Sequence, residues 1–277
     1  MRIASYRHAG RDGFGAVVGD AIVDFTGRWP TLRAALAAGA LDAMREMAEG
    51  PATIPLAAAE LAIPVPDAGK IIAIGMNYAA HIEEMGQKPP THPNLFARFA
   101  DSLVGHGRPI VRPRVSDQLD WEGELAVFIG RGGRHIAEAD ALAHVAGYTC
   151  FNEGSVRDWQ FRVQQTLAGK NFFASGACGP WLATADEVGD PGSLTLTSRV
   201  NGVVMQHAAT SDLVFGVPAL IAYISTFTPL APGDIVVTGN PSGSGFIRKP
   251  PVWLKPGDTV EVEIDRIGTL RNPVVSE

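Results

Sequence analysis

The sequence is poor in cysteine. Cys150 and Cys178 are the only two, and they do not form a Cys-x-x-Cys pair. A small domain held together by disulfide bonds needs more cysteines than this, and a zinc knuckle needs cysteines at close, regular spacing. The sequence therefore indicates neither. We therefore expect both residues to be small buried side chains rather than reactive thiols.

Positive charge is also scarce. The chain has 23 Lys and Arg against 29 Asp and Glu, a formal net charge of -6. An acidic protein does not attract nucleic acid or an anionic membrane, so we expect neither as a partner. No stretch approaches the roughly 18 consecutive apolar residues of a membrane-spanning helix, and the first residues lack the apolar region of a signal peptide. These absences predict a cytoplasmic protein.

A phosphate-binding loop is missing as well. The glycine-rich stretch 238–245 lacks the Gly-Lys-Ser/Thr ending of such loops, and the prolines at 250 and 251 prevent a normal helix from following it. Nucleotide binding is therefore not expected here.

Glycine and proline are plentiful, with 31 and 20 residues, which favours many turns and short strands. Residues 2–25 read as strands with a hairpin turn at Gly19-Asp20, and two short helices follow at 31–38 and 41–49. Three prolines between residues 55 and 66 mark a boundary. We predict a small N-terminal α/β domain at 1–65 and a larger domain at 66–277.

The larger domain shows both strand and helix patterns. Asn77 and Gly86 fit the N-cap and C-cap of a short helix, and Asn201-Gly202 fits the tight turn of a hairpin. We expect further helices at 155–167 and 217–227.

Glu122 and Glu124 begin an otherwise apolar strand that continues to residue 130. Side chains two apart on a strand share a face, about 7 Å from each other, and two like charges there repel unless a cation lies between them. The pair therefore indicates either a divalent metal bound through oxygen or a solvated edge strand that carries acids.

Four other side chains have a functional and a structural interpretation. His81 and Glu84 are neighbours on one helix face, so they form either an acid–base pair or, as spacing alone favours, part of a surface helix. Glu153 lies where a strand leads into a helix, so its carboxylate either binds a ligand or caps the start of the helix. Lys170 lies among apolar residues in the sequence, so its ammonium group either faces an anionic substrate or extends to solvent.

Several motifs occur together in one order. They are Gly75-Met76-Asn77-Tyr78-x-x-His81, Trp121-Glu122-Gly123-Glu124-Leu125-Ala126, Asn152-Glu153-x-Ser155-x-Arg157-Asp158-x-Gln160, Gly169-Lys170-x-Phe172, Gly179-Pro180-Trp181, and Pro232-Gly233-Asp234 with Thr238-Gly239-x-Pro241. In this order they resemble the fumarylacetoacetate hydrolase family over roughly residues 70–265. The resemblance implies an α+β, mostly β fold, a rolled mixed sheet with peripheral helices, and a homodimer.

The resemblance also implies a site. Glu122, Glu124 and Glu153 match the ligands of a Mg²⁺ or Mn²⁺ ion, and His81 with Glu84 matches a water-activating pair. Lys170 matches a catalytic lysine. The positions of Tyr78, Gln160 and Asn240 imply substrate contacts.

Three departures from the family pattern fall near the substrate. Glu153 replaces the usual Asp and adds one methylene group, Phe173 stands where many relatives have Asp, and Asn240 replaces Thr. These changes affect the identity of the substrate more than the class of reaction.

The implied reaction is hydrolysis of a carbon–carbon bond in a 2,4-dioxo acid such as an acylpyruvate, fumarylpyruvate or fumarylacetoacetate. Decarboxylation of a 2-oxo acid, and isomerisation or hydration of a dioic acid from aromatic catabolism, use the same site and remain alternatives. A non-catalytic protein that binds a small acid is a third interpretation.

Overall fold

The computed structural model describes all residues, 1–277, and is mostly β. The strands are β1 (Arg2–His8), β2 (Arg11–Val18), β3 (Ala21–Asp24), β4 (Ile54–Pro55), β5 (Glu60–Leu61), β6 (Ile71–Gly75), β7 (Asn94–Ala97), β8 (Leu103–Val104), β9 (Ile110–Arg112), β10 (Leu119–Asp120), β11 (Gly123–Ile129), β12 (Val145–Asn152), β13 (Ser155–Val156), β14 (Gly176–Thr184), β15 (Thr195–Val200), β16 (Val203–Ala209), β17 (Ile235–Val237), β18 (Thr259–Ile264) and β19 (Gly268–Ser276). The predicted α+β, mostly β class is confirmed.

The helices are short. They are α1 (Leu32–Ala37), α2 (Leu41–Met47), α3 (Ala79–Glu84), α4 (Arg157–Gln160), α5 (Leu167–Lys170), α6 (Ala185–Val188) and α7 (Val217–Phe227), with 3₁₀ turns at η1 (Leu56–Ala58), η2 (Ala100–Ser102), η3 (Glu138–His144), η4 (Pro191–Ser193) and η5 (Thr210–Asp212). None of them has both the length and the apolar character needed to span a membrane.

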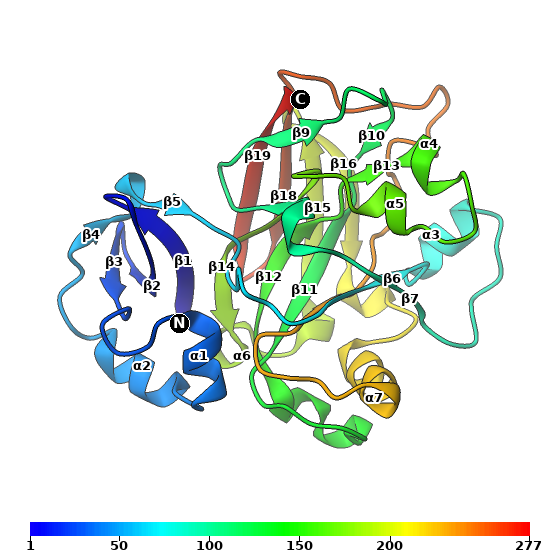
Figure 1. Ribbon diagram of the computed structural model, residues 1–277. Helices are drawn as coiled ribbons and strands as arrows, with labels where there is room; N and C mark the ends of the chain where they lie inside the picture. The colour runs from blue at the N-terminus through cyan, green and yellow to red at the C-terminus, as the bar shows by residue number, and fades with distance from the viewer.

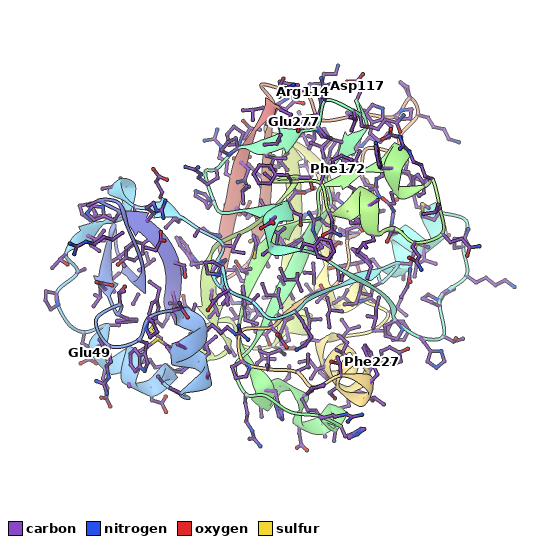
Figure 2. All side chains as sticks on the ribbon, viewed as in Figure 1. Glu49, Arg114, Asp117, Phe172, Phe227 and Glu277 are labelled. Atoms are coloured by element: carbon purple, nitrogen blue, oxygen red, sulfur yellow. The ribbon has the colours of Figure 1, made fainter.

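A 12-stranded mixed sheet forms the frame of the molecule. Its strand order is β4-β3-β2-β1-β14-β12-β11-β17-β6-β7, with β5 beside β1 and β8 beside β14. The pairs β17–β6 and β14–β8 are parallel. A second sheet has the order β16-β15-β18-β19-β9. Glu277 follows β19 at the end of the chain and is held in place, because Arg114 donates hydrogen bonds to its side chain and to its main chain. Figure 2 shows the two residues close together.

Strand β11 lies at the centre of the large sheet, between β12 and β17. Leu125, Val127 and Ile129 belong to one hydrophobic cluster, while Ala126 and Phe128 belong to another. The strand is therefore buried on both faces, which excludes the solvated edge strand considered for Glu122 and Glu124.

The N-terminal residues form the lobe drawn in blue in Figure 1. The predicted hairpin and both helices are present, and the Thr31 hydroxyl caps α1 by accepting the amide N–H of Ala34. However, β1 pairs with β14 inside the large sheet. The division into 1–65 and 66–277 therefore stays a prediction.

The hairpin at Asn201-Gly202 and helix α7 also agree with the sequence pattern. Asn201 and Gly202 have φ of 53° and 79°, as a primed turn requires. Both cysteines are free and buried, and burial raises the pKa of Cys150 to about 12, so the expectation of inert thiols is confirmed.

The single helix expected at 155–167 is wrong. Ser155 and Val156 pair with β10, which holds them extended, and only the short helices α4 and α5 follow. Gly169 lies so close to the Gln160 main chain that a Cβ atom there would come within 2.4 Å of its nitrogen. Without a side chain, α5 can fold back onto α4.

Candidate active site

Helices α3, α4 and α5 lie on the same side of the larger part of the molecule in Figure 1. A cavity of about 200 Å³ is lined by residues of these helices and of strands β6 and β11. Six side chains proposed from the sequence line it: His81, Glu122, Glu124, Gln160, Lys170 and Asn240. The sequence motifs thus bring residues from five separate segments into one small polar site.

Glu122 lies directly before β11 and is held between two cations. Arg157 donates to its Oε1 at 2.7 Å, and the Lys170 ammonium donates to its Oε2. Burial opposes ionisation of this carboxylate, but the two positive charges outweigh it and lower the pKa of Glu122 to about 2. The site therefore contains a buried anion paired with a buried lysine.

Glu124 behaves in the opposite way. Burial, and then the charges of Glu153 and Glu122, raise its pKa well above the ordinary value. Its Oε2 accepts the Gly239 amide N–H at 2.6 Å, which does not compensate for these effects. Three carboxylates are therefore close enough to repel one another.

Glu153 is fully buried but does not line the cavity. Its Oε1 accepts a hydrogen bond from Arg98, and its Oε2 has no hydrogen-bond partner. Burying a carboxylate oxygen without a hydrogen-bond donor costs free energy of folding unless a cation binds that oxygen.

The His81 ring contacts Glu84, with Nδ1 3.1 Å from Oε2. The side chain of His81 is 5% exposed and that of Glu84 is 27% exposed. The amide N–H of Gly243 also reaches Glu84, at 3.3 Å. This geometry favours the acid–base pair over the incidental surface histidine, because the contact uses Nδ1 and leaves Nε2 for proton transfer.

Tyr78 does not contribute to the cavity lining, so the structure does not support its proposed substrate contact. Its side chain is completely buried, its hydroxyl has no hydrogen-bond partner, and burial raises its pKa. Phe173 is likewise outside the cavity. It is 73% exposed and lines a separate surface hollow, so the expectation that Phe173 lies near the substrate is not supported.

Arg157 is a cavity residue to which the sequence assigned no role. Its Nε donates to Asp120 at 2.8 Å and its Nη1 donates to Gln160 at 2.8 Å, in addition to the bond to Glu122. Its guanidinium lies 4.1 Å from the centre of the Phe246 ring. The Arg157-Asp158-x-Gln160 motif was the sequence feature that could have indicated a role for Arg157. Its contacts with Asp120 and Glu122 depend on the fold and cannot be read from the motif.

The carboxylates have the chemistry of a divalent-metal site. No three His, Cys, Asp or Glu side chains are arranged around one point closely enough to hold an ion. Arg157 and Lys170 bind Glu122, and Arg98 binds Glu153. The unpartnered Glu153 oxygen and the mutual repulsion at Glu124 nevertheless fit a cation, since oxygen ligands are those that Mg²⁺ and Mn²⁺ prefer.

Comparisons with known proteins agree with this geometry. The model of the fumarylacetoacetate hydrolase C-terminal domain matches residues 70–275. The chain is 46% identical to the mitochondrial oxaloacetate tautomerase fahd2 of Xenopus laevis over 217 residues, which are 78% of this chain and 68% of the relative. It is 43% identical to the mitochondrial oxaloacetate tautomerase FAHD2A of Homo sapiens over 235 residues, 84% of this chain and 75% of the relative.

One solved relative contains a divalent metal and a 2-oxo acid. Maleylpyruvate hydrolase from Sphingobium sp. SYK-6, in complex with manganese(II) and pyruvate, superposes with a TM-score of 0.82 at 33% identity, over 100% of this chain and 99% of that one. Members of the group that includes this chain therefore bind a divalent metal.

One expectation is contradicted by these comparisons. The relatives from Xenopus laevis and Homo sapiens are named as mitochondrial proteins, so the expected cytoplasmic location is wrong. The residues at the start of the given sequence do not determine the compartment. The family model, the relatives and the arrangement of the site lead to one conclusion: the chain belongs to the fumarylacetoacetate hydrolase family of enzymes.

Proposed function

We propose that the protein catalyses the keto–enol tautomerisation of a small 2-oxo dicarboxylic acid, with oxaloacetate as the first substrate to test. The names of the most similar relatives support this substrate. The volume of the cavity, about 200 Å³, suits a molecule of that size better than a long acyl chain.

One observation carries the proposal: His81, which is hydrogen-bonded to Glu84, and the buried ammonium group of Lys170 line the same small cavity. Tautomerisation of the keto form breaks one C3–H bond and forms one O–H bond at the 2-oxo oxygen. His81 accepts the proton through Nε2, and Glu84 orients the ring and stabilises the resulting positive charge. His81 then delivers the proton taken from C3 to the 2-oxo oxygen, so the reaction needs no other reactant.

Lys170 stabilises the negative charge that develops on the substrate. The ammonium group is buried with Glu122, so a substrate oxygen meets a cation that is already positioned and desolvated. Gln160 and Asn240 line the same cavity and are proposed to bind the substrate carboxylates.

A Mg²⁺ or Mn²⁺ ion completes the proposed site, with Glu122, Glu124 and Glu153 as the residues that would hold it. When bound, such an ion supplies a Lewis acid that polarises the 2-oxo group. The homodimer implied by the family resemblance also stays a prediction.

Hydrolysis of a carbon–carbon bond in a 2,4-dioxo acid is the second candidate. The partial exposure of Glu84 favours it, because water can reach the His81–Glu84 pair. In this reaction the pair deprotonates water for attack at the 4-carbonyl, and the C3–C4 bond breaks. Decarboxylation of oxaloacetate remains the third possible chemistry of the same residues.

Product analysis separates these chemistries. Purified protein with Mn²⁺ is incubated with oxaloacetate and, separately, with acetylpyruvate, and the products are identified by NMR. The proposal predicts faster interconversion of the two oxaloacetate forms without a matching release of pyruvate. Acetate and pyruvate from acetylpyruvate would instead favour the hydrolase, and pyruvate from oxaloacetate would favour the decarboxylase.

A further inference from the structure

Arg98 follows the end of β7 and is almost completely buried. Its Nη1 donates to Glu153 Oε1 and to the Gly154 carbonyl at 3.1 Å. Its Nε donates to the Ser102 hydroxyl at 3.0 Å, and Nη2 donates to the Ser102 carbonyl at 3.2 Å and the Ser175 hydroxyl at 3.3 Å. Every guanidinium nitrogen is bound, so the group is fixed in one orientation.

Glu153 is fixed from both ends. Its main-chain N–H donates to the Glu122 carbonyl at 2.8 Å, and Arg98 holds Oε1 of its side chain. Only Oε2 is free, and that oxygen is buried without any donor. The structure therefore leaves one oxygen of Glu153 unpaired in a buried position, close enough to Glu124 for the two side chains to interact electrostatically.

Arg98 does not line the active-site cavity. Any effect on the reaction must pass through Glu153, whose longer side chain allows more rotamers than an aspartate. An arginine that binds one carboxylate oxygen removes this freedom and directs the other oxygen.

We propose that Arg98 is a positioning residue for the metal site: it holds Glu153 Oε1 so that Oε2 serves as the third oxygen ligand. This inference rests on the metal site of the proposed function. The competing interpretation is that Arg98 is a built-in cation that takes the place of the metal at Glu153. The two interpretations predict opposite changes in metal affinity when the arginine is replaced.

The test measures Mn²⁺ binding to the full-length, substrate-free protein by the EPR signal of free Mn²⁺. We expect Arg98→Lys to weaken binding about 10-fold and Arg98→Met to weaken it up to about 100-fold, as for other residues that orient a metal ligand. Arg108→Lys is the matched control, because Arg108 pairs with Glu60 on the surface at 2.9 Å, and its replacement leaves affinity unchanged. Unchanged or tighter binding by folded Arg98→Lys would overturn the inference.

A second comparison separates positioning from a general effect on folding. In a Glu153→Gln background, Arg98→Lys is expected to cause no further loss of Mn²⁺ affinity, because the ligand that it orients is already impaired. A further 10-fold loss in that background would contradict the inference. If the wild-type protein binds Mn²⁺ and Arg98→Lys weakens binding, but no oxaloacetate is converted, the proposed function fails while the role of Arg98 stands.

Discussion

Lys170 donates a hydrogen bond to Glu122 inside the cavity, and both side chains are about 95% buried, with exposed fractions of 5% and 6%. This cation is proposed to stabilise the charge on the substrate. Lys170→Met removes it at similar length while Arg157 still holds Glu122, so the protein is expected to fold. We predict a fall in kcat of at least roughly 100-fold with oxaloacetate, measured by steady-state kinetics.

The matched control for that variant is Lys255→Met, at an exposed position that does not line the cavity. It should retain wild-type kcat. A Lys170→Met protein that kept full activity would exclude the lysine from catalysis.

The His81–Glu84 pair is expected to transfer the proton. His81→Asn keeps a polar side chain but removes the base, so kcat should fall by about 10² to 10⁴. Glu84→Gln leaves the ring in place without the carboxylate, and a smaller loss is expected. The measurement is the initial rate at saturating substrate and metal; equal rates for wild type and His81→Asn would rule out a role for the pair.

Removal of the metal should lower stability as well as activity. Glu124 and its neighbouring carboxylates repel one another, and a bound cation relieves this repulsion. Mn²⁺ at 100 times its Kd should add about 2.7 kcal/mol to the free energy of unfolding. Thermal melts with EDTA and with Mn²⁺ should therefore differ by about 5 to 10 °C, and superimposable melts would speak against a metal site.

Asp186 links the N-terminal lobe to the rest of the chain, because its Oδ1 accepts from Arg45 in α2 at 2.9 Å. Burial opposes its ionisation, but hydrogen bonds from Thr184 and Arg45 outweigh this and lower its pKa from 3.8 to about 2. A lowered pKa contributes stability above pH 3.8, and that contribution is lost as the pH falls toward 2.

Asp186→Asn removes this titration. At pH 7 the cost should be only about 0.5 kcal/mol, because the pair is partly exposed and screened by solvent. Denaturant titrations between pH 5 and 2 should show a shallower loss of stability for Asp186→Asn than for wild type. Parallel pH curves would show that the pair does not contribute.

The sequence predicted those features that depend on neighbouring residues. The hairpin at Asn201-Gly202 follows from the φ angles that the turn requires, and the His81–Glu84 contact follows from helical spacing. The motifs also placed Glu122, Glu124 and Lys170 in one cavity, although they lie far apart in the chain.

The remaining features depend on contacts between distant segments. Asn77 fits a helix cap in sequence, but its side chain instead bridges the carbonyls of Phe215 and Thr238, which belong to remote loops. Tyr78 lies next in the chain and is completely buried, and it does not line the cavity. The Arg98–Glu153 pair joins residues 55 positions apart, and no local pattern indicates it.

The proposed reaction is a metal-dependent proton transfer on a 2-oxo acid at this cavity. It is tested most directly by following the absorbance of enol-oxaloacetate with Mn²⁺, for the wild-type protein and for Glu122→Gln. We predict that the wild-type protein converts the enol faster than Mn²⁺ in buffer alone, and that Glu122→Gln loses this acceleration. A wild-type protein that binds Mn²⁺ but converts the enol no faster than Mn²⁺ alone would contradict the claim.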